Sequence, residues 1–173
     1  MTDLPTGLAI ERGNQTAREL ELPRPSRLAV SGLIVAFLAW VVLVALSEPI
    51  GRAWGSGLDA RSYWVPRLED PYANANWTTV AAYVYSPAFL QVVAPITSLA
   101  WHPFFAIWTA ILIAAVRFLT GPRLFLFGIG FSVLELIGGN ISLLLAGAIV
   151  IGFRYPAAWA FVLLTKITPG IGL

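Results

Sequence analysis

Long apolar segments separated by short polar ones dominate the chain. The first of them, Leu28–Ser47, contains no charged residue, and about 20 apolar helical residues are enough to cross a bilayer core of ~30 Å. Arg24 and Arg27 precede it, and basic residues mark the cytoplasmic side of such helices. We therefore expect residues 1–27 to form a disordered cytoplasmic tail and the first helix to lead outward.

Five further apolar segments follow: Pro87–Ala100, Phe104–Val116, Leu124–Ile137, Ile141–Phe153 and Pro156–Leu173. If Arg117, Arg123 and Arg154 are cytoplasmic, the four segments from Phe104 onward run inward, outward, inward and outward. Pro87–Ala100 is then a tilted or re-entrant segment that begins and ends outside. In the alternative topology it is a full span, and every later segment is reversed.

Composition places the chain in a membrane. Hydrophobic residues make up 58% and charged residues 12%, against about 25% charge in a typical soluble domain. From Pro71 to the end the charged residues are only Arg117, Arg123, Glu135, Arg154 and Lys166, too few to cover a water-facing surface. The sequence predicts an all-α, polytopic bundle of five or six spans over residues 28–173, in the plasma membrane and incomplete at its C-terminus.

Several functions are disfavoured by what the chain lacks. The net charge is only +2 and Lys and Arg are not clustered, which argues against binding to nucleic acid. There is no cysteine and a single histidine, His102, so disulfides, thiolate metal sites and a histidine-rich metal site are excluded within this sequence.

The first outer loop, residues 48–85, concentrates charge and aromatic side chains, and we expect short helices there at the level of the lipid headgroups. Asp59 lies at a predicted helix start, as a cap or first-turn residue, and shares a helix face with Tyr63 four residues later. An acid in such a loop is more often structural than catalytic. Glu69 and Asp70 are interpreted as solvated loop charges.

Lys166 lies within the last apolar segment, where a charge costs ~2.5–3.5 kcal/mol to insert. Either it reaches an interface or pairs with Glu135, or it faces a cavity and holds an anion. Gly138–Asn140 is either a plain turn or a close backbone approach to a ligand. The preferred topology brings these groups and Asp59 to the outer side, where an acid could deprotonate a hydroxyl while a cation stabilises a departing phosphate.

The motifs "LDARSYW", "YVYSPAFLQVVAPI", "AIWTAIL", "GGNISLLLAGAIV" and "LLTKITPGIG" occur in this order. In order and spacing they resemble glycosyltransferase family 87, polytopic GT-C enzymes that use polyprenyl-phosphate sugars. The resemblance runs from about Gly32 to the end and covers less than half of a typical member. It implies a GT-C-like fold and a lipid-linked sugar donor as substrate, with no cofactor. Some GT-C enzymes bind a divalent metal, but this chain has few carboxylates in one place, so we expect no obligatory metal in this part.

The resemblance also implies roles for individual residues. The family's acid in a D-x-x-x-Y setting, regarded as the base for the acceptor hydroxyl, falls on Asp59 with Tyr63. The implied substrate-binding residues are Tyr63, Arg61, Tyr85, Asn140, Lys166 and Thr168, with Arg67 as a second candidate for the leaving phosphate. The chain departs from the family pattern at Ser86, where the family has proline, and in the G-G-N sequence, which lacks the family's glutamine.

The function expected on this basis is inverting transfer of a hexose, mannose in the first instance. The donor is a polyprenyl phosphate sugar, the acceptor is a lipid or glycan, and the active site is extracytoplasmic. The alternatives are a non-catalytic polytopic membrane protein, such as a transporter or an assembly subunit, or an inactive fragment of the enzyme.

Overall fold

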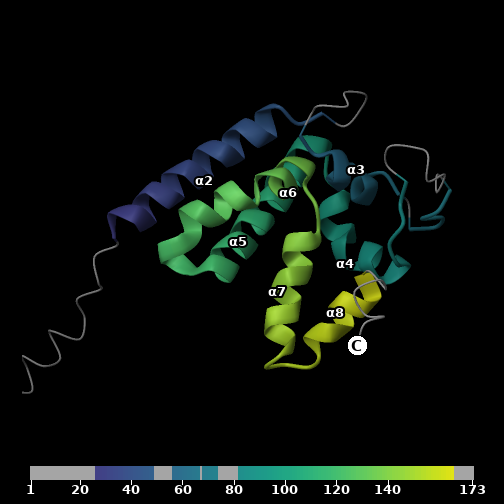
Figure 1. Cartoon of the computed structure of the whole chain (residues 1–173). Coiled ribbons are helices and arrows are strands. Elements are labelled where there is room, and N and C mark those ends of the chain that lie inside the picture. The colour runs from purple at the N-terminus through teal and green to yellow at the C-terminus, as the bar shows by residue number, and fades with distance from the viewer. Residues whose placement is uncertain (1–25, 49–55, 67, 74–81, 166–173) are drawn as a thin grey trace, which may run out of the picture.

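The computed structural model describes residues 26–48, 56–66, 68–73 and 82–165, and within these ranges the chain forms helices and no strand. The all-α prediction is therefore confirmed for the described residues. Figure 1 shows the helices in their arrangement. In chain order they are α2 (Arg27–Ala45), α3 (Leu58–Trp64), α4 (Pro87–Thr97), α5 (Trp101–Phe131), α6 (Val133–Gly138), α7 (Ser142–Gly152) and α8 (Ala158–Thr165).

Helix α5 is a helical hairpin. Its backbone leaves the helical region at Gly121, with φ 68° and ψ 174°, and Pro122 follows. The second half folds back on the first, so that Gly128 lies against the side chains of Thr120 and Val116. A Cβ at Gly128 would be 2.6 Å from the Thr120 side chain and 3.0 Å from that of Val116. The two halves run in opposite directions, as predicted for the segments on either side of Arg117–Arg123.

Helix α2 packs along this hairpin (Figure 1). At one end the Trp101 indole Nε1 donates to Ser47 Oγ at 3.1 Å, and near the middle the Trp40 indole Nε1 donates to the Ala106 carbonyl at 2.8 Å. At the other end a Cβ on Gly32 would lie 3.1 Å from the Phe125 ring. The first half of α5 is therefore antiparallel to α2, and its Gly121 end lies beside the start of α2.

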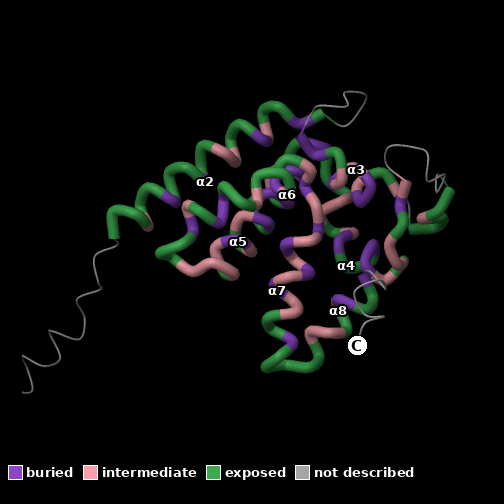
Figure 2. The backbone as a smooth tube through the Cα atoms, viewed as in Figure 1, coloured by how far each residue is buried: buried purple, intermediate pink, exposed green. Residues whose placement is uncertain are grey.

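Helices α2 and α5 are the two described helices that are long and apolar enough to cross a membrane. Much of α2 is exposed (Figure 2). Its exposed residues include large apolar ones such as Leu33 and Phe37. Apolar surface on this scale is usual where a helix faces lipid. These features support membrane association.

The other apolar helices are shorter than the predicted spans. Helices α4 and α7 have 11 residues each and the described part of α8 has 8, so they are about 16, 16 and 12 Å long at ~1.5 Å per residue. A full crossing needs about 30 Å, so the described residues do not contain five or six complete spans. Local breaks explain the difference: Gly139 is left-handed, with φ 70°, and Pro156 follows α7.

Both ends of α4 lie against α3. Phe89, near its start, packs edge-on against Tyr63 with ring centroids 5.5 Å apart, and the Trp64 indole Nε1 donates to the Leu99 carbonyl just beyond its end at 2.9 Å. A helix held at both ends by one seven-residue neighbour does not cross a membrane. This arrangement favours the re-entrant interpretation of Pro87–Ala100, and the topology of the segment stays a prediction.

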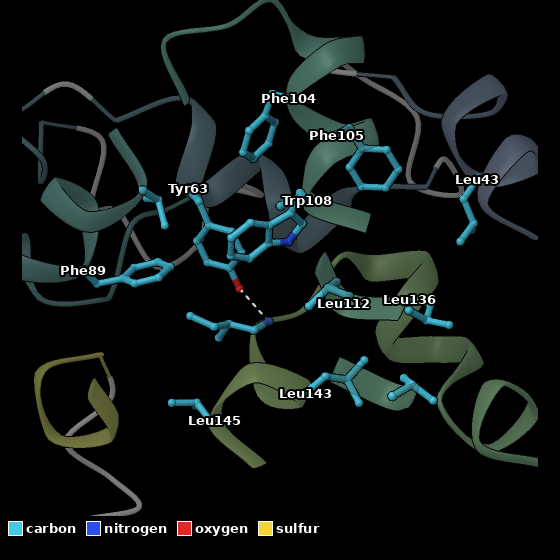
Figure 3. Packing of buried hydrophobic residues seen from close by; sticks show 14 of the residues in the cluster. Leu43, Tyr63, Phe89, Phe104, Phe105, Trp108, Leu112, Leu136, Leu143 and Leu145 are labelled. Carbon is cyan, nitrogen blue, oxygen red and sulfur yellow. Dashed lines mark hydrogen bonds between the residues drawn. The ribbon is translucent and has the colours of Figure 1, made fainter. Parts of the chain in front are cut away.

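The core is most aromatic where α3, α4 and the start of α5 meet the turn between α6 and α7 (Figure 3). We call the following residues the aromatic cluster: Tyr63, Tyr85, Phe89, Trp101, Phe104, Phe105 and Trp108. Trp108 is at its centre, with ring centroids 5.3 Å from Tyr63 and 6.2 Å from Phe104. Its indole Nε1 donates to the Gly139 carbonyl at 2.7 Å, which ties the turn to the cluster.

Candidate functional site

The site begins with the way α3 is held at its first residues. Gly57 precedes the helix in a left-handed conformation, with φ 96°, and its N–H donates to the Ile137 carbonyl at 2.7 Å. A Cβ there would lie 2.6 Å from the Trp101 ring, so glycine is needed for both backbone and space. The contact fixes the first turn of α3 against α6, and Asp59 is in that turn.

Asp59 lies opposite the turn that joins α6 to α7. Its Oδ2 accepts a hydrogen bond from Asn140 Nδ2 at 2.9 Å. A Cβ added at Gly138 would come within 2.7 Å of the same oxygen, so glycine leaves the room that the carboxylate occupies. The structure thus brings together two predicted site residues that are 81 positions apart.

The orientation of the Asn140 amide is set by Ser142. Asn140 Oδ1 accepts from the Ser142 backbone N–H at 2.9 Å and from Ser142 Oγ at 2.6 Å. With its oxygen engaged on that side, the amide presents its NH₂ group to Asp59. One carboxylate oxygen is therefore held by an oriented donor, while the structure records no hydrogen bond to Oδ1 among the described residues.

Tyr63 and Tyr85 form the neighbouring part of the site. Their hydroxyl oxygens are 3.3 Å apart and their ring centroids 5.2 Å apart. The Ile141 N–H donates to Tyr63 Oη at 3.3 Å, the contact drawn in Figure 3. Tyr72 Oη donates to the Tyr85 carbonyl at 2.8 Å. These contacts join α3, the loop before α4 and the start of α7.

Burial and charge keep these tyrosines protonated. Burial is the largest cause that raises the pKa of Tyr63, and Tyr85 and Asp59 raise it further. Burial also raises the pKa of Tyr85; the hydrogen bond with Tyr63 lowers it, and the charges of Asp59 and Glu135 raise it. Their hydroxyls are therefore neutral groups that can donate or accept hydrogen bonds at neutral pH.

Glu135 and Arg61 complete the charged groups near this end of the bundle. Glu135 acts electrostatically on Tyr85. Its Oε2, like Arg61 Nε, is buried and has no hydrogen-bond partner among the described residues. Arg61 is two residues from Asp59, and residues at that spacing do not face each other on a helix. Arg61 thus forms no recorded contact with Asp59, and the structure does not join it to the polar side chains of the site.

Ser86, where the resemblance would expect proline, joins the start of α4 to the end of α8. Ser86 caps α4, accepting at its Oγ from the Phe89 N–H at 3.4 Å, and the same hydroxyl donates to the Leu164 carbonyl of α8. The end of α8 is thereby placed beside Tyr85. Lys166, Thr168 and Arg67, which sequence reasoning also placed at the site, lie outside the described residues.

We call Asp59, Tyr63, Tyr85, Asn140 and Ser142 the polar cluster. Four of them were predicted from the sequence, and Ser142 was not. A signal for it existed: Asn140 lies two residues before the start of α7, and an Asn at that position favours an Asx turn. Glu69 and Asp70 are exposed, as expected of solvated loop charges. No group of three or more His, Cys, Asp or Glu that could hold a metal ion occurs among the described residues.

The cluster combines a carboxylate held on one oxygen, two neutral phenols and an amide at one end of an apolar bundle. Such a set can accept a proton from a hydroxyl and hydrogen-bond a polyhydroxylated ligand. No family model, curated protein or solved structure matches the chain. The resemblance to glycosyltransferase family 87 is thus carried by the motifs alone.

Proposed function

We propose that the protein is an integral membrane glycosyltransferase that moves a hexose, mannose in the first instance, from a polyprenyl phosphate donor to a lipid or glycan acceptor. The observation that carries the proposal is the Asp59 carboxylate, held through Oδ2 by Asn140 at 2.9 Å, with no partner on Oδ1 in the described part of the chain. The membrane-length apolar helices α2 and α5 support a setting in which a lipid-linked donor is accessible.

In this proposal Asp59 is the general base. Its carboxylate takes the proton of the acceptor hydroxyl while that oxygen attacks the anomeric carbon. The bond between that carbon and the phosphate oxygen breaks, polyprenyl phosphate leaves with the bonding electrons, and the configuration inverts. Asn140 keeps the carboxylate in position, and the neutral hydroxyls of Tyr63 and Tyr85 are available to hydrogen-bond a sugar.

The remaining assignments rest on sequence. Lys166 and Thr168 are proposed to bind the donor phosphate, with Arg61 or Arg67 as a second cation. The first outer loop and the polar cluster are proposed to be extracytoplasmic, and the N-terminus cytoplasmic. The partners in this scheme are the lipid-linked sugar, the acceptor and membrane lipid, and no nucleic acid is involved.

The test is hexose transfer in membranes that contain the protein, with radiolabelled polyprenyl-phosphate mannose as donor. Asp59→Asn keeps the size of the side chain but removes the base, and a general base contributes about 10²–10⁴-fold to rate. Asp70→Asn is the matched control, because Asp70 is an exposed acid of the same loop. We expect a loss in that range for the first variant and full transfer for the second; equal rates at equal abundance would contradict the role of Asp59.

The second candidate is a non-catalytic membrane protein, such as a transporter or an assembly subunit. It is favoured by the helix breaks at Gly121 and Gly139, because interrupted helices are common at transporter binding sites. In this case the Asp59–Asn140 hydrogen bond would serve only to hold α3 to α7. Asp59→Asn would then lower the melting temperature, and the native protein would transfer no hexose.

A further inference from the structure

A groove of about 310 Å³ lies between α2 and α5, away from the polar cluster. One wall is the face of α2 from Leu33 to Trp40, and the other is the face of α5 from Ala110 to Arg117, with Phe125 completing it after the hairpin turn. The lining positions on each helix follow the spacing i, i+3, i+4, i+7, which defines one helix face. The volume is at the lower end of the range of about 300–1,000 Å³ for small-molecule sites.

Small residues make room for this groove. Ala36, Ala110 and Ala114 line it, while Leu33 and Phe37 stand largely exposed at its edge. The lined part of α5 runs over the eight residues from Ala110 to Arg117, a rise of about 10 Å at ~1.5 Å per residue. A narrow apolar groove that is open along its side fits a flexible hydrocarbon chain better than a compact polar ligand.

Arg117 is the charged side chain in this lining. Its guanidinium carbon lies 5.9 Å from the centroid of the Phe125 ring, and within the described residues it forms no ion pair. Arg27 and Arg123 are exposed near the same end of the helix pair. A half-buried guanidinium without a carboxylate partner is well suited to a phosphate, which it can bind through two parallel hydrogen bonds.

We propose that this groove binds a phospholipid of the surrounding bilayer, with an acyl chain between α2 and α5 and the headgroup phosphate on Arg117. Charge complementarity selects this occupant. The apolar groove ends at the Arg117 guanidinium, and the apolar acyl chain of a phospholipid ends at a headgroup that carries a phosphate. The inference rests on the proposed membrane placement but not on sugar transfer. It adds a lipid site at the end of the α2–α5 pair that is opposite to Ser47 and Trp101.

The first experiment measures the affinity of the purified full-length protein for phosphatidylglycerol in detergent, by native mass spectrometry. We expect Arg117→Gln to weaken binding at least tenfold. Arg123→Gln is the matched control, since it removes an arginine from the same end that does not line the groove, and binding should stay within twofold. Equal losses in the two variants would indicate attraction to any basic residue and would overturn the proposal.

A second variant tests the contribution of the lipid acyl chain separately from that of the headgroup. Ala114→Leu fills the groove and keeps Arg117. Because Ala114 is exposed, the protein should still fold with the larger side chain, and an unchanged melting temperature checks this. We expect it to lose phosphatidylglycerol as Arg117→Gln does. Glycerol phosphate, which lacks the acyl chains, should not compete at millimolar concentration. Undiminished binding by Ala114→Leu, or competition by glycerol phosphate, would contradict a lipid in the groove.

The fluorescence of Trp40, which lines the groove, reports the position of the bound acyl chain. Phosphatidylglycerol with brominated acyl chains should quench the part of the fluorescence that Trp40→Phe removes. Absence of quenching would mean that another segment or a second copy covers the groove, and the proposal would be wrong. Because Arg117 has no part in the proposed transfer, lost lipid binding with intact transfer supports this site, whereas lost transfer with intact lipid binding counts only against the proposed function.

Discussion

The α2–α5 helix pair and the polar cluster use their side chains in opposite ways. Along the pair, contacts are made by small and aromatic residues, and the indoles of Trp40 and Trp101 supply one hydrogen bond each. In the polar cluster, by contrast, Asn140 is hydrogen-bonded to Asp59 at 2.9 Å and to Ser142 Oγ at 2.6 Å, and Tyr63 Oη accepts from the Ile141 N–H at 3.3 Å. The exposed surface of the pair suits an apolar medium, whereas the cluster holds polar groups in fixed positions.

The difference extends to what supports each region. The polar cluster is backed by the aromatic cluster, in which Phe104, Phe105 and Trp108 are almost fully buried. The outer surface of the pair has no such cover in the described residues, and large side chains such as Phe37 and Phe127 are exposed. Substitutions should therefore destabilise the first region far more than the second.

The largest effect is expected at the centre of the aromatic cluster. Trp108→Ala should cost about 3–5 kcal/mol of unfolding free energy, because it removes a buried aromatic side chain and the hydrogen bond to Gly139. Phe131→Ala is the control: its side chain is 91% exposed, and its loss should change stability little. Denaturant unfolding in detergent measures both. Similar costs for the two variants would remove the contrast between the regions.

A smaller loss is expected at the turn that carries Asn140. Gly139→Ala puts a residue with a Cβ at a left-handed backbone position, and this Cβ would lie 2.8 Å from the Ala60 Cβ. The left-handed backbone conformation alone costs an alanine about 1–2 kcal/mol. At Gly130, within α5, a Cβ meets nothing within 4 Å, so Gly130→Ala should stabilise the helix by about 0.5–1 kcal/mol. Melting temperatures that shift in the same direction would contradict this prediction.

Asn140→Leu tests whether the cluster positions a reacting group. Replacing the amide by a side chain of similar size removes the hydrogen bond to Asp59. Because the acceptor is charged, the free energy of unfolding should fall by about 1.5–3 kcal/mol. In the transfer assay we expect kcat to fall while KM for the donor stays unchanged, because Asn140 acts through Asp59. A change confined to stability, with kcat intact, would make the contact purely structural.

The smallest effect concerns alkaline pH. Burial raises the pKa of Tyr63, Tyr83 and Tyr85 in the folded protein, whereas in the unfolded chain tyrosines ionise near pH 10. The unfolded state then binds fewer protons, so stability is constant below about pH 10 and falls above it. Tyr63→Phe removes one of these groups and should make the fall in melting temperature between pH 9 and 11 shallower. Identical slopes would contradict the assignment.

The sequence predicted the parts of this fold that depend on local pattern. The apolar segment Leu28–Ser47 became α2 nearly residue for residue, and the reversal between Val116 and Leu124 is the hairpin turn at Gly121. Within the described residues only α2 and α5 are long enough to cross a membrane, fewer than the five or six predicted spans, because apolar composition alone does not show where Gly139 and Pro156 end a helix.

The site was predictable only in part. Asp59 and Tyr63 share a helix face by spacing alone, whereas the contact between Asp59 and Asn140 depends on how α3 packs on the α6–α7 turn, across 81 positions. The hydrogen bond between Asn140 and Ser142 was not predicted either, although an Asn two residues before a helix start favours an Asx turn. The buried, unpartnered oxygen of Glu135 could not be predicted, because burial of one atom is a property of the packed structure.

The central claim is that the carboxylate of Asp59 acts as a base, and chemical rescue tests it most directly. Asp59→Ala removes the base, so transfer from polyprenyl-phosphate mannose should fall by about 10²–10⁴-fold. Added formate, a small carboxylate, should restore a measurable part of that transfer in this variant and have no effect on the native protein. An Asp59→Ala protein that transfers mannose at the native rate, at equal abundance and without formate, would contradict the claim.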